Sequence, residues 1–217
     1  MKLAVCTPHA NPYCLGSWAY MVHVWLKLPK NSIFLRTQSQ PVATARNALT
    51  VKALQSGATH LLWVDDDIFP KNPEAFQMLY EQDKDIISAL CKYRTPLDKW
   101  VCKPAGVSLV ESVKEVGMGF TLVKAQVYLE MAGSYDLQDV QFYRWAGSTV
   151  APTSEDVSFC RMAKVLGFDS FIHNGVLCGH ADTVVFDDSE KGFTQLRPGI
   201  KPKKGPEKME VLRGGET

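Results

Sequence analysis

The chain has 217 residues, of which 46% are hydrophobic and 22% charged, and its formal net charge is +1. This is the composition of a globular protein, and the length suits one domain with a sizeable core. A net charge this small excludes binding to a polyanion through the field of the whole molecule. Contact with a nucleic acid would need a local basic patch.

The six cysteines form no CxxC pair and lack the dense spacing of a disulfide framework. We expect buried free thiols in a reducing compartment. The N-terminus lacks the apolar core and cleavage site of a secretory signal. No apolar run approaches the ~20 residues that are needed to cross a bilayer. The sequence therefore predicts a cytoplasmic protein that does not contact a membrane.

Apolar strands and helices alternate along most of the chain. The predicted strands cover residues 3–6, 33–35, 60–64, 85–91, 116–123 and one or two short stretches within 168–178. The predicted helices cover residues 15–28, 44–56, 73–81, 124–131 and 154–166, with Asn72 as the N-cap of the third. Such alternation predicts an α/β fold, with a mostly parallel sheet flanked by helices.

Two stretches depart from this alternation. Residues 133–153 are polar and aromatic without a clear period, which predicts a long loop, and long loops in compact domains are usually functional or disordered. Residues 191–217 hold seven Lys or Arg against three Glu, together with three Pro and five Gly. We therefore expect one domain over 1–187 and a basic, flexible tail over 188–217.

The clearest chemical signal is the run Asp65, Asp66 and Asp67, which follows the apolar strand 60–64. In open α/β sheets, ligands bind in the crevice beyond the carboxyl ends of the strands. Three adjacent carboxylates repel one another there unless a cation is present. Their oxygens suit Mg²⁺ or Mn²⁺ bridged to substrate phosphates. The alternative is a solvated acidic turn or a helix cap.

This run is one of several short motifs that occur in order along the chain. They are Ala45-Arg46-Asn47, the strand with its acidic run at 60–68, Asp85-Ile86-Ile87-Ser88, Gly117-Met118-Gly119-Phe120, Ser154-Glu155-Asp156 and Gly179-His180. Over residues 1–182 this order resembles glycosyltransferases of the GT-A fold, and it is most similar to small family-2-like enzymes of phages and bacteria. The resemblance implies a hexosyltransferase-type enzyme that uses a nucleotide-sugar donor, with a UDP-sugar as the first candidate.

The resemblance also implies a metal site in the DxD motif. Asp65 would reach the nucleotide ribose or the sugar and stand beside the metal, Asp67 would ligate Mn²⁺ or Mg²⁺, and Asp66 would support them. A histidine near the end of the domain often completes such a site, and His180 occupies that place. The alternative for a single histidine is a hydrogen-bonded residue of the core.

Other residues are expected to bind the donor. Thr7 and Pro8 follow the first strand and resemble the nucleotide-base contact of such enzymes. Arg46 lies near a helix start, where a cation is unfavourable, so a phosphate or the Asp65 cluster should pair with it unless it is a surface arginine. Gly117 and Gly119 would let the backbone approach the sugar or the acceptor, and they also fit a strand bulge.

Glu155 and Asp156 begin a predicted helix, where carboxylates are favoured and can act as caps. By resemblance they form the "ED" motif of the family. Asp156 would then be the general base that removes the proton of the acceptor hydroxyl, and Glu155 would orient the acceptor. These roles assume an inverting reaction.

The acceptor is less defined. The phage-like resemblance and the basic tail suggest a 5-hydroxymethylated pyrimidine in phage DNA, flipped from the duplex, with the enzyme in the host cytoplasm. A cell-surface glycan or a small molecule is the alternative. Further binding candidates are Lys92, Tyr93, Arg94, Trp100, Tyr143 and Trp145.

Two other function classes stay open. One is a two-metal nuclease or phosphotransferase that uses Asp65, Asp67 and Glu155, and the other is a silent GT-A-like binding module. No GxGxxG follows the first strand and no Walker motif is present, which argues against a dinucleotide-binding dehydrogenase and a P-loop enzyme.

Overall fold

The computed structural model describes residues 1–9, 16–91, 108–147, 152–180, 184–186 and 193–195. The chain divides into two compact units, Met1–Ala181 and Asp182–Thr217. In the second unit, strands β11 (Val184–Phe186) and β12 (Phe193–Gln195) pair antiparallel. The domain boundary predicted after residue 187 therefore lies between β11 and β12, two strands that pair with each other.

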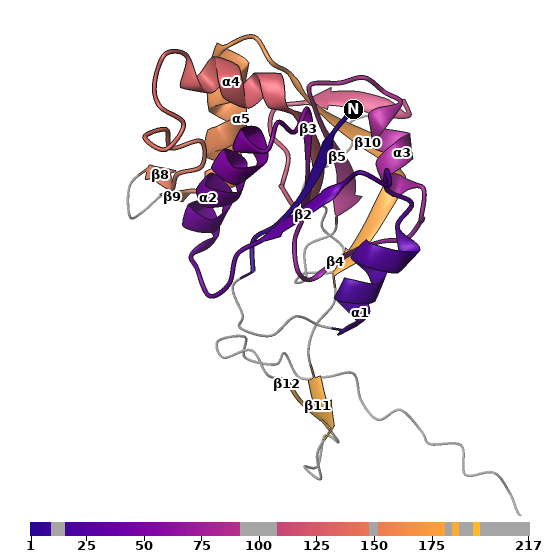
Figure 1. Cartoon of the computed structure of the whole chain (residues 1–217). Helices are drawn as coiled ribbons and strands as arrows, with labels where there is room; N and C mark the ends of the chain where they lie inside the picture. The colour runs from indigo at the N-terminus through magenta and orange to yellow at the C-terminus, as the bar shows by residue number, and fades with distance from the viewer. Residues whose placement is uncertain (10–15, 92–107, 148–151, 181–183, 187–192, 196–217) are drawn as a thin grey trace, which may run out of the picture. The chain divides into compact units, whose positions relative to one another are not determined.

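The first unit is built on one sheet, with eight strands among the described residues, in the order β2-β1-β3-β7-β5-β10-β4 and with β6 also paired to β10 (Figure 1). The strands are β1 Leu3–Thr7, β2 Ile33–Arg36, β3 His60–Val64, β4 Ile68–Pro70, β5 Ile86–Cys91, β6 Val110–Val113, β7 Phe120–Lys124 and β10 Ser170–His180. Strands β2, β1 and β3 run parallel, as do β5 and β10, while β7, β4 and β6 are antiparallel to their neighbours. The predicted α/β class with a mostly parallel sheet is confirmed.

Helices cover both faces of this sheet (Figure 1). They are α1 Gly16–Tyr20, which continues into the π-helical turn η1 Met21–Trp25, α2 Val42–Gln55, α3 Ala75–Tyr80, α4 Ala125–Ala132 and α5 Glu155–Val165. Residues of α2, α4 and α5 share one buried cluster, and residues of α1, η1 and α3 share the other. The architecture is therefore three-layered, with helices on either side of the sheet.

The strands supply both clusters because neighbouring side chains point to opposite faces. In β3, Trp63 belongs to the cluster under α2, α4 and α5, while Leu62 and Val64 belong to the cluster under α1 and α3. A strand that is buried on both sides is apolar at nearly every position, and the few polar side chains in it, such as Ser88 of β5, form hydrogen bonds. This requirement explains why β1, β3 and β5 are continuous apolar runs in the sequence.

Several predicted boundaries are wrong. The third helix begins at Ala75 and not at Pro73. Asn72 still makes the contact expected of an N-cap residue, because its side-chain oxygen accepts the backbone N–H of Glu74, two residues on, at 2.9 Å. The strand predicted at 116–123 begins only at Phe120, since the two-glycine segment before it is irregular and follows the separate strand β6.

The region after α4 is more ordered than predicted. The expected loop 133–153 contains a two-stranded ladder of β8 (Ala146–Gly147) and β9 (Pro152–Thr153). The stretch predicted as one or two short strands is the single strand β10, whose pairing with β5 shifts register between His173 and Leu177. The two missed strands are too short to leave a periodic signal.

The cysteine prediction holds where it can be compared. Cys6, Cys91, Cys160 and Cys178 are buried free thiols. The other two cysteines, Cys14 and Cys102, lie outside the described residues.

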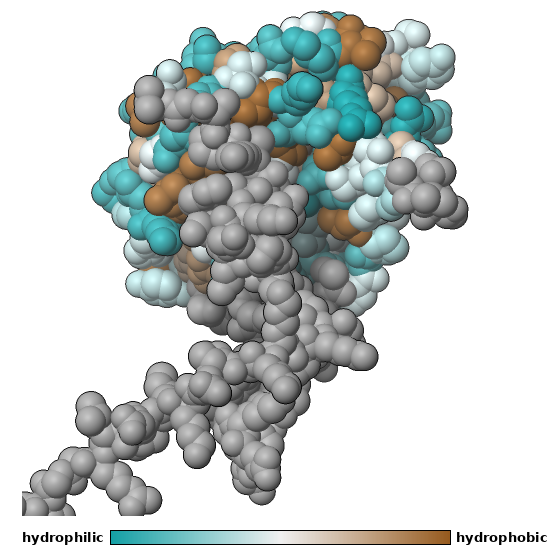
Figure 2. Space-filling model, turned by 180° about the vertical axis from the view of Figure 1, so that it is seen from behind, coloured by the Kyte–Doolittle hydropathy of each residue, from teal (hydrophilic) through white to brown (hydrophobic). Residues whose placement is uncertain are grey.

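Burial of apolar side chains in the two clusters leaves a surface of mixed hydropathy. On the face seen in Figure 2, hydrophobic residues form small patches separated by hydrophilic ones. A search of the described part of the chain finds no helix long and apolar enough to span a bilayer.

Candidate functional site

The predicted site residues lie mainly where parallel strands end. Cys6 of β1 pairs with Trp63 of β3, so the residues after Cys6 run beside the start of the acidic run. Thr7 is buried and its carbonyl accepts the N–H of Thr37, which follows β2. The carboxyl ends of β2, β1 and β3 thus form one continuous edge, the usual place for a ligand in an open α/β sheet.

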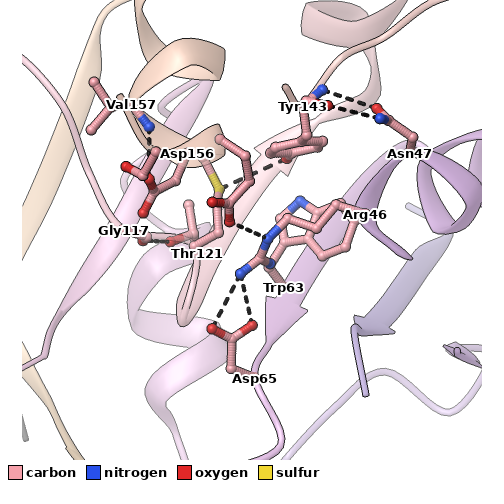
Figure 3. A network of polar contacts seen from close by, with 12 residues as sticks. Arg46, Asn47, Trp63, Asp65, Gly117, Thr121, Tyr143, Asp156 and Val157 are labelled. Carbon is pink, nitrogen blue, oxygen red and sulfur yellow. Dashed lines mark hydrogen bonds and ion pairs between the residues drawn. The ribbon is translucent and has the colours of Figure 1, made fainter. Parts of the chain in front are cut away.

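Asp65 is held by Arg46 of α2 (Figure 3). The Nη2 of Arg46 donates to both carboxylate oxygens of Asp65, at 2.9 Å and 3.2 Å. The backbone of Asp65 is also fixed, because its N–H donates to Gly119 and its carbonyl accepts the indole N–H of Trp18. The Asp65 cluster is therefore one of the two partners that the sequence suggested for Arg46.

Arg46 also reaches the helix that begins with the predicted ED motif. Its Nε donates to Oε1 of Glu155 at 3.2 Å, and its guanidinium lies over the rings of Trp63 and Tyr143. The Arg46 side chain is 3% exposed and that of Glu155 is 7% exposed. One buried cation thus connects the acidic run of β3 with the first turn of α5.

Burial and neighbouring charges shift the pKa values of Asp65 and Arg46 in opposite directions. Burial raises the pKa of the Asp65 carboxyl to about 6, although the charge of Arg46 lowers it. Burial alone would lower the pKa of Arg46, but Asp65 and Glu155 hold it above its usual value. Arg46 is therefore a permanent positive charge inside the site.

Asp66 has a different partner. Its Oδ2 lies 2.5 Å from Nδ1 of His9, and the backbone N–H of His9 donates to the hydroxyl of Thr37. His9 is 4% exposed, and its Nε2 has no hydrogen-bond partner among the described residues. The sequence did not reveal His9, whose only signal is its position directly after Thr7 and Pro8.

The Arg46 cation compensates Asp65, and His9 is a second partner of the acidic run through Asp66, which weakens the argument that adjacent carboxylates require a metal. Asp67 is the most buried of the three, at 8% exposure. In the antiparallel pairing of β10 with β4, His180 lies opposite Ile68, the residue after Asp67. Among the described residues, no group of three or more His, Cys, Asp or Glu side chains could hold a metal ion.

The two glycines have different surroundings. The carbonyl of Gly117 accepts the hydroxyls of Thr121 and Ser88, at 2.7 Å and 3.2 Å. A Cβ on Gly119 would lie 3.1 Å from Cγ1 of Ile68 and 3.8 Å from Oδ2 of Asp65. Gly119 therefore lets the segment before β7 pack closely against the acidic turn.

Asp156 is the more open of the two carboxylates at the start of α5. Its Oδ1 accepts the hydroxyl of Ser154 and the N–H of Val157. Its Oδ2 has no hydrogen bond within the described part of the chain. Asp156 is partly exposed, whereas Glu155 is buried against Arg46. The first turn thus holds one fixed carboxylate and one that is accessible.

Aromatic side chains that are joined by hydrogen bonds lie beside Arg46. The hydroxyl of Tyr128 accepts the indole N–H of Trp63 at 2.8 Å and lies 2.7 Å from the hydroxyl of Tyr143. Asn47 donates to the carbonyl of Tyr143 and accepts its N–H, at 2.8 Å and 2.9 Å. Tyr143, a binding candidate from the sequence, is therefore a buried residue of the core.

Some sequence candidates cannot be placed. Lys92, Tyr93, Arg94 and Trp100 lie outside the described residues, as does most of the basic tail. Pro8 is buried directly after Thr7, beside the same strand edge.

Comparisons with known proteins agree with this architecture. The Anp1 family model matches residues 34–103, less than half of the chain. The crystal structure of A197 from STIV is similar over 95% of this chain and 100% of that one, with 14% identity and a TM-score of 0.55. The crystal structure of GalNAc-T7 with UDP, GalNAc and Mn²⁺ is similar over 83% of this chain, with 10% identity and a TM-score of 0.50.

This chain spans 43% of the GalNAc-T7 chain. A comparison with curated protein sequences finds no match. At these identities the structural likeness establishes the fold, and the predicted GT-A fold is confirmed.

Proposed function

We propose that the chain is a metal-dependent glycosyltransferase that moves a sugar from a nucleotide-diphosphate sugar to an acceptor hydroxyl. The observation that carries this proposal is the buried Arg46, which joins Asp65 at the end of β3 to Glu155 at the start of α5. The Anp1 family is glycosyltransferase-like, and GalNAc-T7 was crystallised with UDP, GalNAc and Mn²⁺.

The donor side is the edge formed by β1 and β3. Thr7 and Pro8 are the proposed nucleotide-base contacts, and Asp65, Asp66, Arg46, Gly117 and Gly119 surround the ribose, diphosphate and sugar. Asp66 acts by fixing the ring of His9. UDP is the nucleotide we propose, because GalNAc-T7 binds it on the same fold.

The residues present fit a divalent cation that is shared with the substrate. Asp67 and His180 would hold it, with Asp65 nearby. The carboxylates suit either Mn²⁺ or Mg²⁺, and the imidazole favours Mn²⁺, since Mg²⁺ takes oxygen ligands. An ion bound through substrate phosphates needs only one or two protein ligands, so the lack of a three-residue group is no obstacle. When bound, the ion would neutralise the charge that develops on the departing nucleoside diphosphate.

Asp156 is the proposed general base. Its accessible carboxylate would take the proton of the acceptor hydroxyl as the hydroxyl oxygen bonds to the anomeric carbon of the sugar. The bond between that carbon and the diphosphate breaks, and the nucleoside diphosphate leaves with its electrons. Glu155 orients the acceptor from its fixed position on Arg46. These roles belong to an inverting reaction, which is part of the proposal.

The two-metal nuclease is disfavoured by the same contacts. It would need Asp65 and Glu155 as metal ligands, yet both are bound to the single buried cation Arg46. Two cations about 4 Å apart beside that guanidinium would meet strong repulsion.

The acceptor in this proposal is a hydroxyl of a saccharide or a small molecule. A hydroxymethylated pyrimidine in DNA remains the alternative, and it depends on basic tail residues that lie outside the described part of the chain.

The test is a panel of nucleotide-sugars incubated with the protein and Mn²⁺, read by release of the nucleoside diphosphate. We expect release from at least one sugar nucleotide, and its loss with Asp67→Ala. An exposed acid on the loop after α4, Asp139→Ala, is the matched control and should keep full activity. Mg²⁺-dependent cleavage of phosphodiesters with no release from any sugar nucleotide would instead establish the nuclease.

A further inference from the structure

Trp145 is exposed, although it lies two residues after a part of the chain that is held in the core. It is 60% exposed, whereas Trp18 and Trp63 are 5% and 0% exposed. Large aromatic side chains are usually buried, because they lose much apolar surface to the core. The exposed indole is therefore a candidate contact surface.

The backbone that leads to Trp145 is fixed by the core. Phe142 and Tyr143 are buried, and the ring of Tyr143 stacks on Phe159 of α5, with ring centroids 4.8 Å apart and an angle of 13° between the planes. Figure 3 shows the two hydrogen bonds by which Asn47 of α2 holds the backbone of Tyr143. Trp145 follows this anchor by two residues, so its position is set by packing against α2 and α5.

The β8–β9 ladder brings Trp145 to the first turn of α5. In this ladder Ala146 pairs with Thr153 and Gly147 with Pro152. One step outward along the antiparallel register, Trp145 stands opposite Ser154. Residues directly opposite each other present their side chains on the same face. The hydroxyl of Ser154 in turn donates to Oδ1 of Asp156.

We infer that Trp145 is the acceptor-binding residue, with its indole packed against the ring of a saccharide whose hydroxyl faces Asp156. This inference rests on the proposed function and specifies the substrate class of its acceptor side. The indole supplies a flat apolar face for the C–H face of a sugar ring, and the anchor at Tyr143 fixes the backbone from which the indole projects.

The charge around Trp145 favours a neutral acceptor over a nucleic acid. Residues 133–158 contain four carboxylates, namely Asp136, Asp139, Glu155 and Asp156, and one basic residue, Arg144. A strand of nucleic acid binds through Lys and Arg that track its phosphates. Because Glu155 is already paired with Arg46, three further carboxylates and one arginine remain on this segment, which offers few contacts to a chain of phosphates.

The test compares Trp145→Ala with Trp145→Phe and with a control on the same segment, Tyr135→Ala, whose ring is 76% exposed. With a neutral saccharide acceptor, we expect Trp145→Ala to raise the acceptor KM about tenfold, the effect of losing one aromatic contact. Trp145→Phe should recover most of the affinity, and Tyr135→Ala should match the parent chain. Donor hydrolysis without acceptor should be equal in all four proteins.

A second readout does not require turnover. Saccharide titration should change the tryptophan fluorescence of the parent chain but not that of Trp145→Ala. An unchanged acceptor KM in Trp145→Ala, with donor hydrolysis intact, would overturn the inference and leave the proposed function standing. Transfer to a hydroxymethylated oligonucleotide but to no saccharide would also overturn it. Absence of donor hydrolysis in the parent chain would count against the proposed function itself.

Discussion

The two faces of the central sheet are built on different chemistry. The face under α1, η1 and α3 is packed with apolar side chains such as Leu62, Phe76 and Leu79. The face under α2, α4 and α5 also contains Trp63, Tyr128 and Tyr143, joined by hydrogen bonds, with the Arg46–Glu155 ion pair beside them.

This difference separates stability from function. Apolar packing tolerates substitution at the cost of a cavity, whereas a buried polar group left without its partner carries a large desolvation cost. Apart from Trp18, whose indole fixes the backbone of Asp65, the α1/α3 face should therefore affect only stability. The α2/α5 face should affect both stability and the proposed reaction.

The largest effect is expected for Arg46→Met. This change leaves Glu155 as a buried, unpaired carboxylate and releases Asp65, and breaking a buried pair costs about 3 kcal/mol or more. We expect a lower midpoint of urea unfolding and loss of donor turnover. Adding Glu155→Gln should restore part of the stability but not the activity. Equal stability of Arg46→Met and the parent chain would refute this role for the ion pair.

On the opposite face, Leu79→Ala should cost about 3 kcal/mol, because it removes a fully buried side chain and leaves a cavity. Leu79 lies on α3, in the apolar cluster away from Arg46. Urea unfolding should show the loss, while kcat of the folded protein at low temperature stays unchanged. A large drop in kcat would contradict the separation of the two faces.

Tyr128→Phe should have a smaller effect. It removes the hydroxyl that accepts the N–H of Trp63 and contacts the hydroxyl of Tyr143, and an unsatisfied buried group costs about 1–3 kcal/mol. The ring itself is retained, so packing should be preserved. Thermal unfolding measures the loss, and Tyr80→Phe on α3 is the matched control. A drop in the control as large as in Tyr128→Phe would contradict the role of this hydroxyl network.

The smallest effect on stability is expected for Gly119→Ala. The added methyl group would press against the side chain of Ile68, which can shift by a few tenths of an ångström, so the cost should be about 1 kcal/mol. Because the same methyl group approaches Asp65, the KM for the donor should rise more than stability falls. An unchanged donor KM would show that Gly119 serves packing alone.

The sequence predicted some parts of the fold well and others not at all. Strands β1, β3 and β5 are buried on both faces, so their apolar runs are visible without a structure. The reversed direction of β7 and the short strands β8 and β9 leave no periodic signal, because direction and pairing depend on distant partners.

The residues of the candidate site also differ in how well the sequence could predict them. Asp65 and Arg46 could be singled out because an acidic run at a strand end and a cation at a helix start need a partner, and Glu155 because it resembles the ED motif. The pairing of His9 with Asp66 could not, since it joins residues 57 positions apart through the register of β1 and β3. Likewise, no local pattern indicated that Asn47 fixes Tyr143 and thereby the segment with Trp145.

The central claim is that the edge beyond β1 and β3 binds a nucleoside diphosphate together with a metal. Calorimetric titration of the full chain with UDP, with and without Mn²⁺, tests this claim most directly. We predict binding that requires Mn²⁺, disappears with Asp67→Asn and persists with Asp139→Asn. Binding that is independent of the metal, or retained in full by Asp67→Asn, would contradict the account.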